Sequence, residues 1–222
     1  MKTELIDKLA AEFEAANFFD KIPAQIDGYT LKKMLSSDGD KFIYFTYENI
    51  SAHRNLKAYF HDETKEYKVS TTIGLTEFCL TNFFTEDFNH FTEFLTDKLD
   101  ATIKNLSTPI NADSDIFIAD KKFATWEYGK NLPQNLNGFE LFITPKNPVR
   151  ITNGSYIIIN YSDFNTNREL SIFYNVYTDN FSGESQIGGV HQPLYIFDAK
   201  NLQELEKILT VNLSAELSKL GD

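Results

Sequence analysis

The sequence predicts an α+β protein built as a tandem duplication of one α-β(4–5)-α unit, with antiparallel sheets covered by helices. The main observation is an internal match, in which residues 42–106 align without gaps with residues 156–220 and 14 of the 65 aligned pairs are identical. A fixed long-period match of this kind indicates two copies of one structural unit. Within each copy, strand-like runs are followed by a helical run, and 222 residues are enough for two small domains.

The two repeats meet in a short linker at residues 107–113, which contains Pro109. We therefore expect a first α+β repeat at residues 1–110 and a second at residues 111–222. A linker of this length favours packing of the repeats into one compact pseudo-dimer with an approximate two-fold axis.

The first repeat begins with a predicted amphipathic helix at residues 3–18, which places Ile6, Leu9 and Phe13 on one stripe. Polar turns then separate five strand-like runs. These strands are expected at residues 29–35, 41–47, 56–60, 66–73 and 77–84. Thr85 is the predicted N-cap of a closing helix, whose apolar residues recur one turn apart as far as Leu106.

The second repeat is expected to follow the same order. A helix is predicted at residues 116–128, with Ile116, Phe123 and Trp126 on its apolar stripe. Strands are expected near residues 139–144, 155–161, 170–177 and 185–190, with a short fifth strand at 194–197. Asp198 is the predicted N-cap of a last helix that carries a stripe of leucines.

The predicted strand near residue 45 is apolar on both sides. Regular alternation places Phe42 and Tyr44 on one face and Ile43 and Phe45 on the other. Helices cover only one of these faces, so the other requires a second cover. The other repeat is the favoured cover, and an external partner is the alternative.

The charge of the chain is strongly negative, with 21 basic and 32 acidic residues and a net charge of −11. An acidic surface disfavours nucleic acid and anionic lipid. It favours solubility alone, and a protein partner with a basic surface is the alternative. Neither a membrane-spanning apolar run nor a signal peptide is recognisable, so we expect a soluble, cytoplasmic protein. Three arginines beside eighteen lysines are typical of an AT-rich bacterial genome.

Motifs that carry chemistry are scarce. The lone Cys79 excludes an internal disulfide and a multi-thiolate metal site, and no phosphate-binding loop or nucleophile elbow is present. The run His61-Asp62-Glu63 offers metal ligands but no complete set, and residues 111–115 open like a calcium loop without its glycine and glutamate. We expect no metal and no cofactor, and an enzyme is not the favoured class.

Two of the three arginines, Arg54 and Arg168, occupy the same position in the two repeats. Arginine is preferred over lysine where a planar, forked donor is needed. The favoured interpretation is a structural clamp to a carboxylate or to loop carbonyls. The alternative makes this pair the candidate partner-binding residues.

Three classes of function are compatible with the sequence. The favoured one is a non-catalytic acidic protein-binding module, such as an inhibitor, an immunity-type factor or a chaperone-like adaptor. A strand meander closed by a helix, twice in one chain, is similar in layout to the tandem Pur-type and Whirly-type single-strand binding proteins and, in outline, to the TATA-binding protein. That resemblance implies a nucleic-acid-binding pseudo-dimer, although both acidic halves lack the basic faces of those proteins. An enzyme with an unrecognised site is the third possibility.

Overall fold

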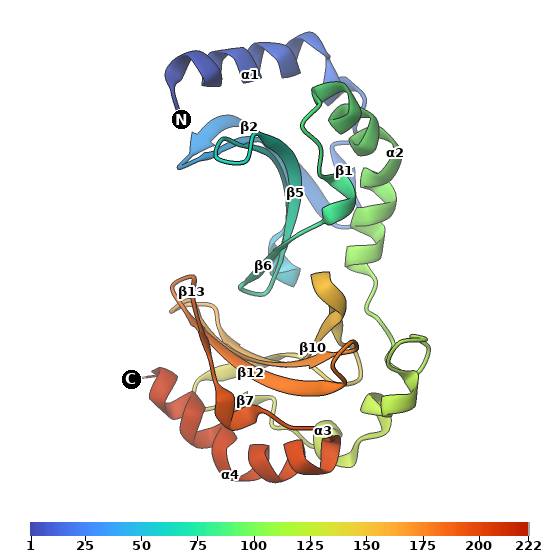
Figure 1. Cartoon of the computed structure of the whole chain (residues 1–222), viewed down its shortest axis with the longest axis vertical. Coiled ribbons are helices and arrows are strands. Elements are labelled where there is room, and N and C mark those ends of the chain that lie inside the picture. The colour runs from blue at the N-terminus through green and yellow to red at the C-terminus, as the bar shows by residue number, and fades with distance from the viewer. Residues whose placement is uncertain (222) are drawn as a thin grey trace. The chain divides into compact units, whose positions relative to one another are not determined.

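The computed structural model describes residues 1–221, of which Asn153 is described by its backbone alone, and it shows a mixed α+β fold. The chain forms two compact units, Met1–Thr108 and a second that begins at Pro109. Each unit has one antiparallel sheet with helices on one of its faces (Figure 1). No helix in the described part of the chain is long and apolar enough to cross a membrane.

The first unit is a six-stranded sheet whose strands follow the order of the chain, because short turns join each strand to the next. Its helices are α1 (Thr3–Ala15) and α2 (Phe88–Ser107). Its strands are β1 (Gln25–Ile26), β2 (Tyr29–Asp38), β3 (Lys41–Asn49), β4 (Arg54–His61), β5 (Glu66–Ile73) and β6 (Thr76–Cys79). Short 3-10 helices lie at η1 (Phe18–Asp20), η2 (Ile50–Ala52) and η3 (Thr81–Phe83).

Aromatic side chains form the core between this sheet and its helices. Phe13 of α1 stacks on Tyr44 of β3 with 4.6 Å between ring centroids, and Phe91 of α2 stacks on Tyr67 of β5 at 5.2 Å. The predicted N-cap Thr85 is wrong, because the backbone of Thr85 pairs with Tyr67. Asp87 caps α2 instead, and its carboxylate accepts a 2.8 Å bond from the backbone N–H of His90.

The second unit is a seven-stranded sheet in the order β13-β12-β11-β10-β8-β7, with β9 paired to β10. Its strands are β7 (Asn135–Leu136), β8 (Phe139–Ile143), β9 (Val149–Arg150), β10 (Ser155–Asp163), β11 (Arg168–Asn175), β12 (Asn180–Ile187) and β13 (Val190–Pro193). Its helical segments are η4 (Ala119–Lys121), η5 (Phe123–Thr125), α3 (Glu127–Lys130), η6 (Thr152–Gly154), η7 (Tyr195–Phe197) and α4 (Leu202–Gly221). Helix α4 lies along one face of the sheet and buries a stripe of leucines there (Figure 1).

The continuous helix predicted at residues 116–128 is wrong. Lys122 has a left-handed backbone with φ of 59°, which a right-handed helix cannot include, so two 3-10 helices and the short α3 replace it. Near the start of the segment, the Asp115 carboxylate accepts a bond from the Phe117 N–H and forms a local turn. Ile116 is consequently 88% exposed instead of lying on an apolar stripe.

Three further predictions in the second unit need correction. The strand expected at residues 185–190 is interrupted, because Gly188 and Gly189 both have positive φ and form the turn between β12 and β13. The short strand expected at 194–197 is the 3-10 helix η7. Asn201, rather than Asp198, caps α4, since its side chain accepts a 2.9 Å bond from the Glu204 N–H.

A β-bulge in each unit corrects the predicted strand faces. The register of β3 against β4 shifts between Ile43 and Phe45, and that of β10 against β11 shifts between Ile157 and Ile159. A bulge opposes two residues to one, so adjacent side chains point to the same side. The helix-facing residues of these strands are therefore Phe42, Tyr44, Phe45 and Tyr47 in β3, and Tyr156, Ile158, Ile159 and Tyr161 in β10. Most apolar side chains of β3 and β10 therefore point toward the helices, and the helix-free face of each sheet is mainly polar.

Candidate functional site

The two candidate partner-binding arginines lie at the ends of the long helices. Arg54, the first residue of β4, donates from Nη1 to the carbonyl of Leu106 in the last turn of α2. Arg168, the first residue of β11, donates in the same way to the carbonyl of Leu220 in the last turn of α4. A helix leaves its last carbonyls unpaired, and a cation also interacts favourably with that end of the helix dipole. The acceptors are helix-end carbonyls instead of the carboxylate or loop carbonyls expected for a clamp, so each arginine joins a strand to a helix. A role in partner binding stays a prediction.

The helix-free face of the second sheet carries a buried polar cluster. The Nδ2 group of Asn160 donates to the Glu169 carboxylate at 2.9 Å and to Ser171 Oγ at 2.8 Å. Ser162 Oγ donates to Asn160 Oδ1 at 2.7 Å. Glu169 is only 2% exposed, so its carboxylate depends on these donors in place of water. This cluster fixes the polar middle of the face.

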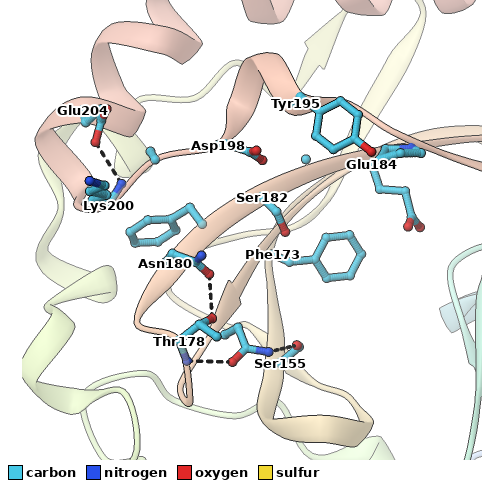
Figure 2. Close-up of a pocket in the computed structure, with 15 residues that line it drawn as sticks. Ser155, Phe173, Thr178, Asn180, Ser182, Glu184, Tyr195, Asp198, Lys200 and Glu204 are labelled. Carbon is cyan, nitrogen blue, oxygen red and sulfur yellow. Dashed lines mark hydrogen bonds between the residues drawn. The ribbon is translucent and has the colours of Figure 1, made fainter.

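A cleft of about 610 Å³ opens at one side of the same unit, next to the cluster (Figure 2). The start of β12 forms its floor, and the segment around η7 forms one wall. Its residues come from the ends of β10, β11 and β13, from the turn between β11 and β12, from β12, from the chain between β13 and α4, and from the first turn of α4. They are Ser155, Phe173, Asn175, Thr178, Asn180, Phe181, Ser182, Gly183, Glu184, Pro193, Tyr195, Asp198, Ala199, Lys200 and Glu204.

Backbone bonds hold the η7 wall against β12. Phe181 and Ala199 exchange two backbone hydrogen bonds of 2.8 and 3.2 Å, and the Leu194 N–H donates to the carbonyl of Gly183 at 2.8 Å. Gly183 also allows the wall to approach closely, because a Cβ at this position would lie 2.7 Å from Phe197. The cleft therefore has a fixed wall that needs no ligand to form.

The opposite wall is held by short polar side chains. Asn175 Nδ2 donates to Ser155 Oγ at 3.0 Å, and the Thr178 N–H donates to Asn175 Oδ1 at 3.1 Å. Thr178 Oγ1 donates to Asn180 Oδ1 at 2.8 Å (Figure 2). The hydroxyl and amide groups on this side are thus oriented by one another.

The cleft combines aromatic rings with an excess of negative charge. Tyr195 is 76% exposed at the rim, while Phe173 is half-buried. Three carboxylates line the cleft against one lysine, Lys200. The Glu204 carboxylate accepts the Lys200 backbone N–H at the start of α4. Ring faces and carboxylates together favour a cation.

The two remaining carboxylates of the cleft are those of Glu184 and Asp198. Glu184 lies 2.6 Å from the imidazole of His191, whereas Asp198 is exposed beside η7. Carboxylates separated in this way can contact a cationic side chain from two directions. Among the described side chains that line the cleft, no nucleophile is hydrogen-bonded to a base.

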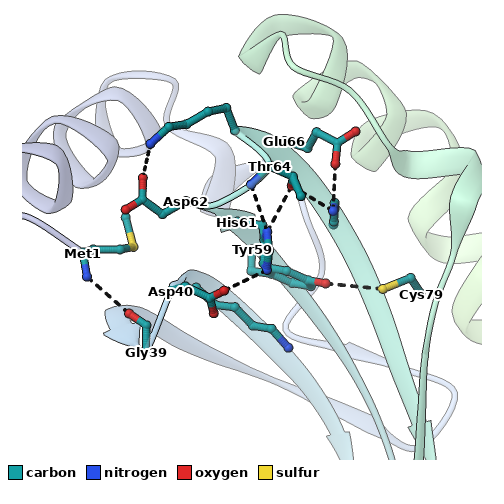
Figure 3. A network of polar contacts seen from close by, with 12 residues as sticks. Met1, Gly39, Asp40, Tyr59, His61, Asp62, Thr64, Glu66 and Cys79 are labelled. Atoms are coloured by element: carbon teal, nitrogen blue, oxygen red, sulfur yellow. Dashed lines mark hydrogen bonds and ion pairs between the residues drawn. The ribbon is translucent and has the colours of Figure 1, made fainter.

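The helix-free face of the first unit holds a different polar network (Figure 3). Asp40, His61 and Glu63 place possible metal-ligand atoms within 4.8 Å of one another. The His61 Nε2 atom lies 3.0 Å from Asp40, and Nδ1 lies 3.0 Å from Thr64 Oγ1. Sequence reasoning noted His61 and Glu63 but missed Asp40, which lies on the preceding turn. Both ring nitrogens are already engaged by protein groups, which favours a structural hydrogen-bond network.

Glu77 joins two lysines on this face. Its carboxylate accepts the Ser70 hydroxyl at 2.8 Å and lies 3.6 Å from Lys41 Nζ and 3.8 Å from Lys57 Nζ. Burial raises the pKa of Glu77, but the Ser70 hydroxyl and the two lysines outweigh burial and hold that pKa below its usual value. Lysines on this face are therefore largely neutralised by carboxylates within the unit.

The cleft was not visible to sequence reasoning, because its walls come from separate segments and its acidic residues form no motif. The sequence signal that could have indicated the cleft is the change of polar residues at aligned positions of the two halves, for example Lys68 to Ser182. No protein-family model matches the chain, and comparisons with curated proteins and with solved structures gave no match.

Proposed function

We propose that this chain is a non-catalytic protein-binding module whose second unit binds a basic surface of a partner protein in the acidic cleft. The observation that carries the proposal is the pairing of Tyr195 and Phe173 with the Glu184 and Asp198 carboxylates around one cleft. Exposed aromatic anchors are typical of protein interfaces, and charge complementarity speeds and orients association. Inhibitors, immunity-type factors and chaperone-like adaptors are the classes of protein that work in this way.

We further infer that the chain is a tandem duplication. Six elements, β3 to β6, η3 and α2, have counterparts whose first and last residues lie 114 positions later, namely β10 to β13, η7 and α4. The bulges, and the bonds of Arg54 and Arg168 to helix ends, recur at the same spacing. The packing of the repeats about a two-fold axis stays a prediction.

Divergence between the repeats supports a binding role for the helix-free faces. The aligned helix-facing positions remain apolar, as in the pairs Leu95 and Leu209 or Leu99 and Leu213. On the helix-free faces the chemistry changes, since Lys57 aligns with Ser171, Lys68 with Ser182 and Glu77 with His191. The hydrophobic core needs only the apolar helix-facing residues, so residues on the helix-free face can change to suit a binding function.

Affinity purification from the source organism tests this function. The bait is the full chain, compared with Glu184→Gln/Asp198→Asn and with the control Glu93→Gln/Asp97→Asn, which removes the same charge from exposed sites on α2. We expect one basic protein to be enriched by the wild type and the control, and at least tenfold less by the cleft variant. Equal recovery by all three baits would overturn the assignment of the cleft.

A further inference from the structure

Lys68 of the first unit lies in a site made by its own chain. Its Nζ group is 2.7 Å from the Glu66 carboxylate, donates to Thr64 Oγ1 at 2.9 Å, and lies 5.0 Å from the centre of the Phe84 ring. The side chain is 11% exposed, so this site holds the ammonium group largely out of water. Carboxylate, hydroxyl and ring face are the groups expected around a bound ammonium.

The cleft of the second unit lies at the aligned positions. Thr178, Asn180 and Asp198 stand 114 residues after Thr64, Glu66 and Phe84, and all three line the cleft. Lys68 itself corresponds to Ser182, whose side chain is far shorter and which is exposed on the cleft floor. Both residues have an aromatic neighbour across the sheet, since Lys68 pairs with Tyr59 and Ser182 with Phe173.

From this correspondence we infer that the cleft is a lysine-binding site, which takes a lysine side chain of the partner protein at the place that Lys68 fills in the first unit. The inference rests on the proposed function and names the group that is recognised. The short Ser182 leaves the space, and Thr178 keeps the hydroxyl. The carboxylate moves from the strand to the η7 wall, because Asn180 replaces Glu66 and Asp198 replaces Phe84.

The remaining cleft residues fit the rest of a lysine side chain. The methylene stem of lysine packs on apolar surface while its ammonium group stays with polar partners. Phe173 and Pro193 offer that apolar surface, and Tyr195 adds an exposed ring at the rim. Glu184 supplies a second carboxylate in the lining.

Nuclear magnetic resonance titration of the full chain with acetylated, amidated tripeptides tests this inference. Gly-Lys-Gly is compared with Gly-norleucine-Gly, which keeps the stem and removes the charge, and with Gly-Glu-Gly. We expect Gly-Lys-Gly to shift the amide resonances of β12 and η7 and to bind at least tenfold tighter than the other two. Equal affinity for the lysine and norleucine peptides would overturn the inference.

Variants of Ser182 and Asp198 distinguish the lysine-binding site from the more general protein-binding function. Ser182→Lys places a lysine where Lys68 lies in the first unit, so we expect it to fill the cleft and weaken Gly-Lys-Gly binding at least tenfold. The control Ser37→Lys adds the same side chain at an exposed position of β2 in the first unit and should leave binding unchanged. Asp198→Asn keeps the test decisive if Ser182→Lys unfolds the unit, because it should weaken the same binding without adding volume.

The outcomes for the purified partner then distinguish the two claims. A partner that binds the wild type and Ser182→Lys equally, but not Glu184→Gln/Asp198→Asn, would overturn lysine insertion and leave the cleft function standing. Tripeptide binding that follows the predicted order, with no partner protein recovered by any bait, would support the lysine site and overturn the proposed function.

Discussion

Arg54 and Arg168 each join the start of a strand to the end of a helix, and their contacts are equivalent in the two units. We expect Arg54→Lys and Arg168→Lys each to lower the free energy of unfolding by about 1.5 kcal/mol, because a lysine cannot reproduce the forked, charge-assisted donor. Arg150→Lys is the control and should change stability by less than about 0.5 kcal/mol, since Arg150 lies over the Phe117 ring and a lysine also supplies a cation there. Thermal unfolding of the three variants makes the comparison. Unchanged melting of both Arg54→Lys and Arg168→Lys would exclude the clamp and direct attention to partner binding.

Glu77 makes the stability of the first unit depend on pH. Burial raises the pKa of Glu77, but the hydroxyl of Ser70 and the charges of Lys57 and Lys41 lower it by more, so the pKa in the folded protein lies below its usual value. A lowered folded pKa stabilises the protein above the unfolded value of about 4.3, and this stabilisation is lost as the pH falls through the folded pKa. We expect Glu77→Gln to cost about 1 kcal/mol at pH 7 and progressively less between pH 5 and pH 3. Thermal unfolding across this range, with the exposed Glu93→Gln as control, checks it, and a cost independent of pH would contradict the account.

At the scale of the elements, the contact between β12 and η7 shapes the cleft. In Gly183→Ala the added methyl group would meet Phe197 at 2.7 Å, and overpacking of this kind typically costs about 1–3 kcal/mol. We expect a lower melting temperature and weaker Gly-Lys-Gly binding, because the displaced η7 carries Tyr195. Ser37→Ala, at an exposed position of β2 in the first unit, should change neither. A Gly183→Ala variant that melts like the wild type would show that the wall is not packed as described.

The elements with clear periodicity were predictable, and those that depend on local backbone geometry were not. The strand at residues 66–73 and the two long helices follow regular apolar spacing, which sequence reasoning can detect. The predicted helix at 116–128 fails because of the left-handed Lys122, and the strand faces change because of a bulge at Tyr44. Neither lysine nor tyrosine has a preference for a left-handed backbone or for a bulge that would allow these features to be predicted.

The candidate site was harder to predict than the fold. The arginine pair was found because arginine is rare here and recurs at one position in the alignment. The cleft depends instead on a short side chain, because Ser182 stands at the position where the first unit has Lys68. Its significance appears only when the contacts of Lys68 are known, because the sequence does not show that a carboxylate, a hydroxyl and a ring surround that lysine.

At the scale of the whole molecule, we expect the net charge of −11 to favour a basic partner and to oppose binding of nucleic acid. The lysines on the helix-free face of the first unit do not reverse this, because Lys32, Lys41, Lys57 and Lys68 each have a carboxylate within 4 Å. The two units thus share a core design and differ in the chemistry of their helix-free faces. We accordingly propose that the second unit is the one that binds the partner.

Site-specific photo-crosslinking tests the central claim most directly. A benzoylphenylalanine residue replaces Tyr195, which is 76% exposed at the cleft, or Ile50, which is 81% exposed in the first unit, and the full chain is irradiated in lysate of the source organism. We predict that position 195 crosslinks to one basic protein, that position 50 does not, and that Glu184→Gln/Asp198→Asn abolishes the product. Equal crosslinking at both positions, or a nucleic acid as the product, would contradict a partner-binding cleft in the second unit.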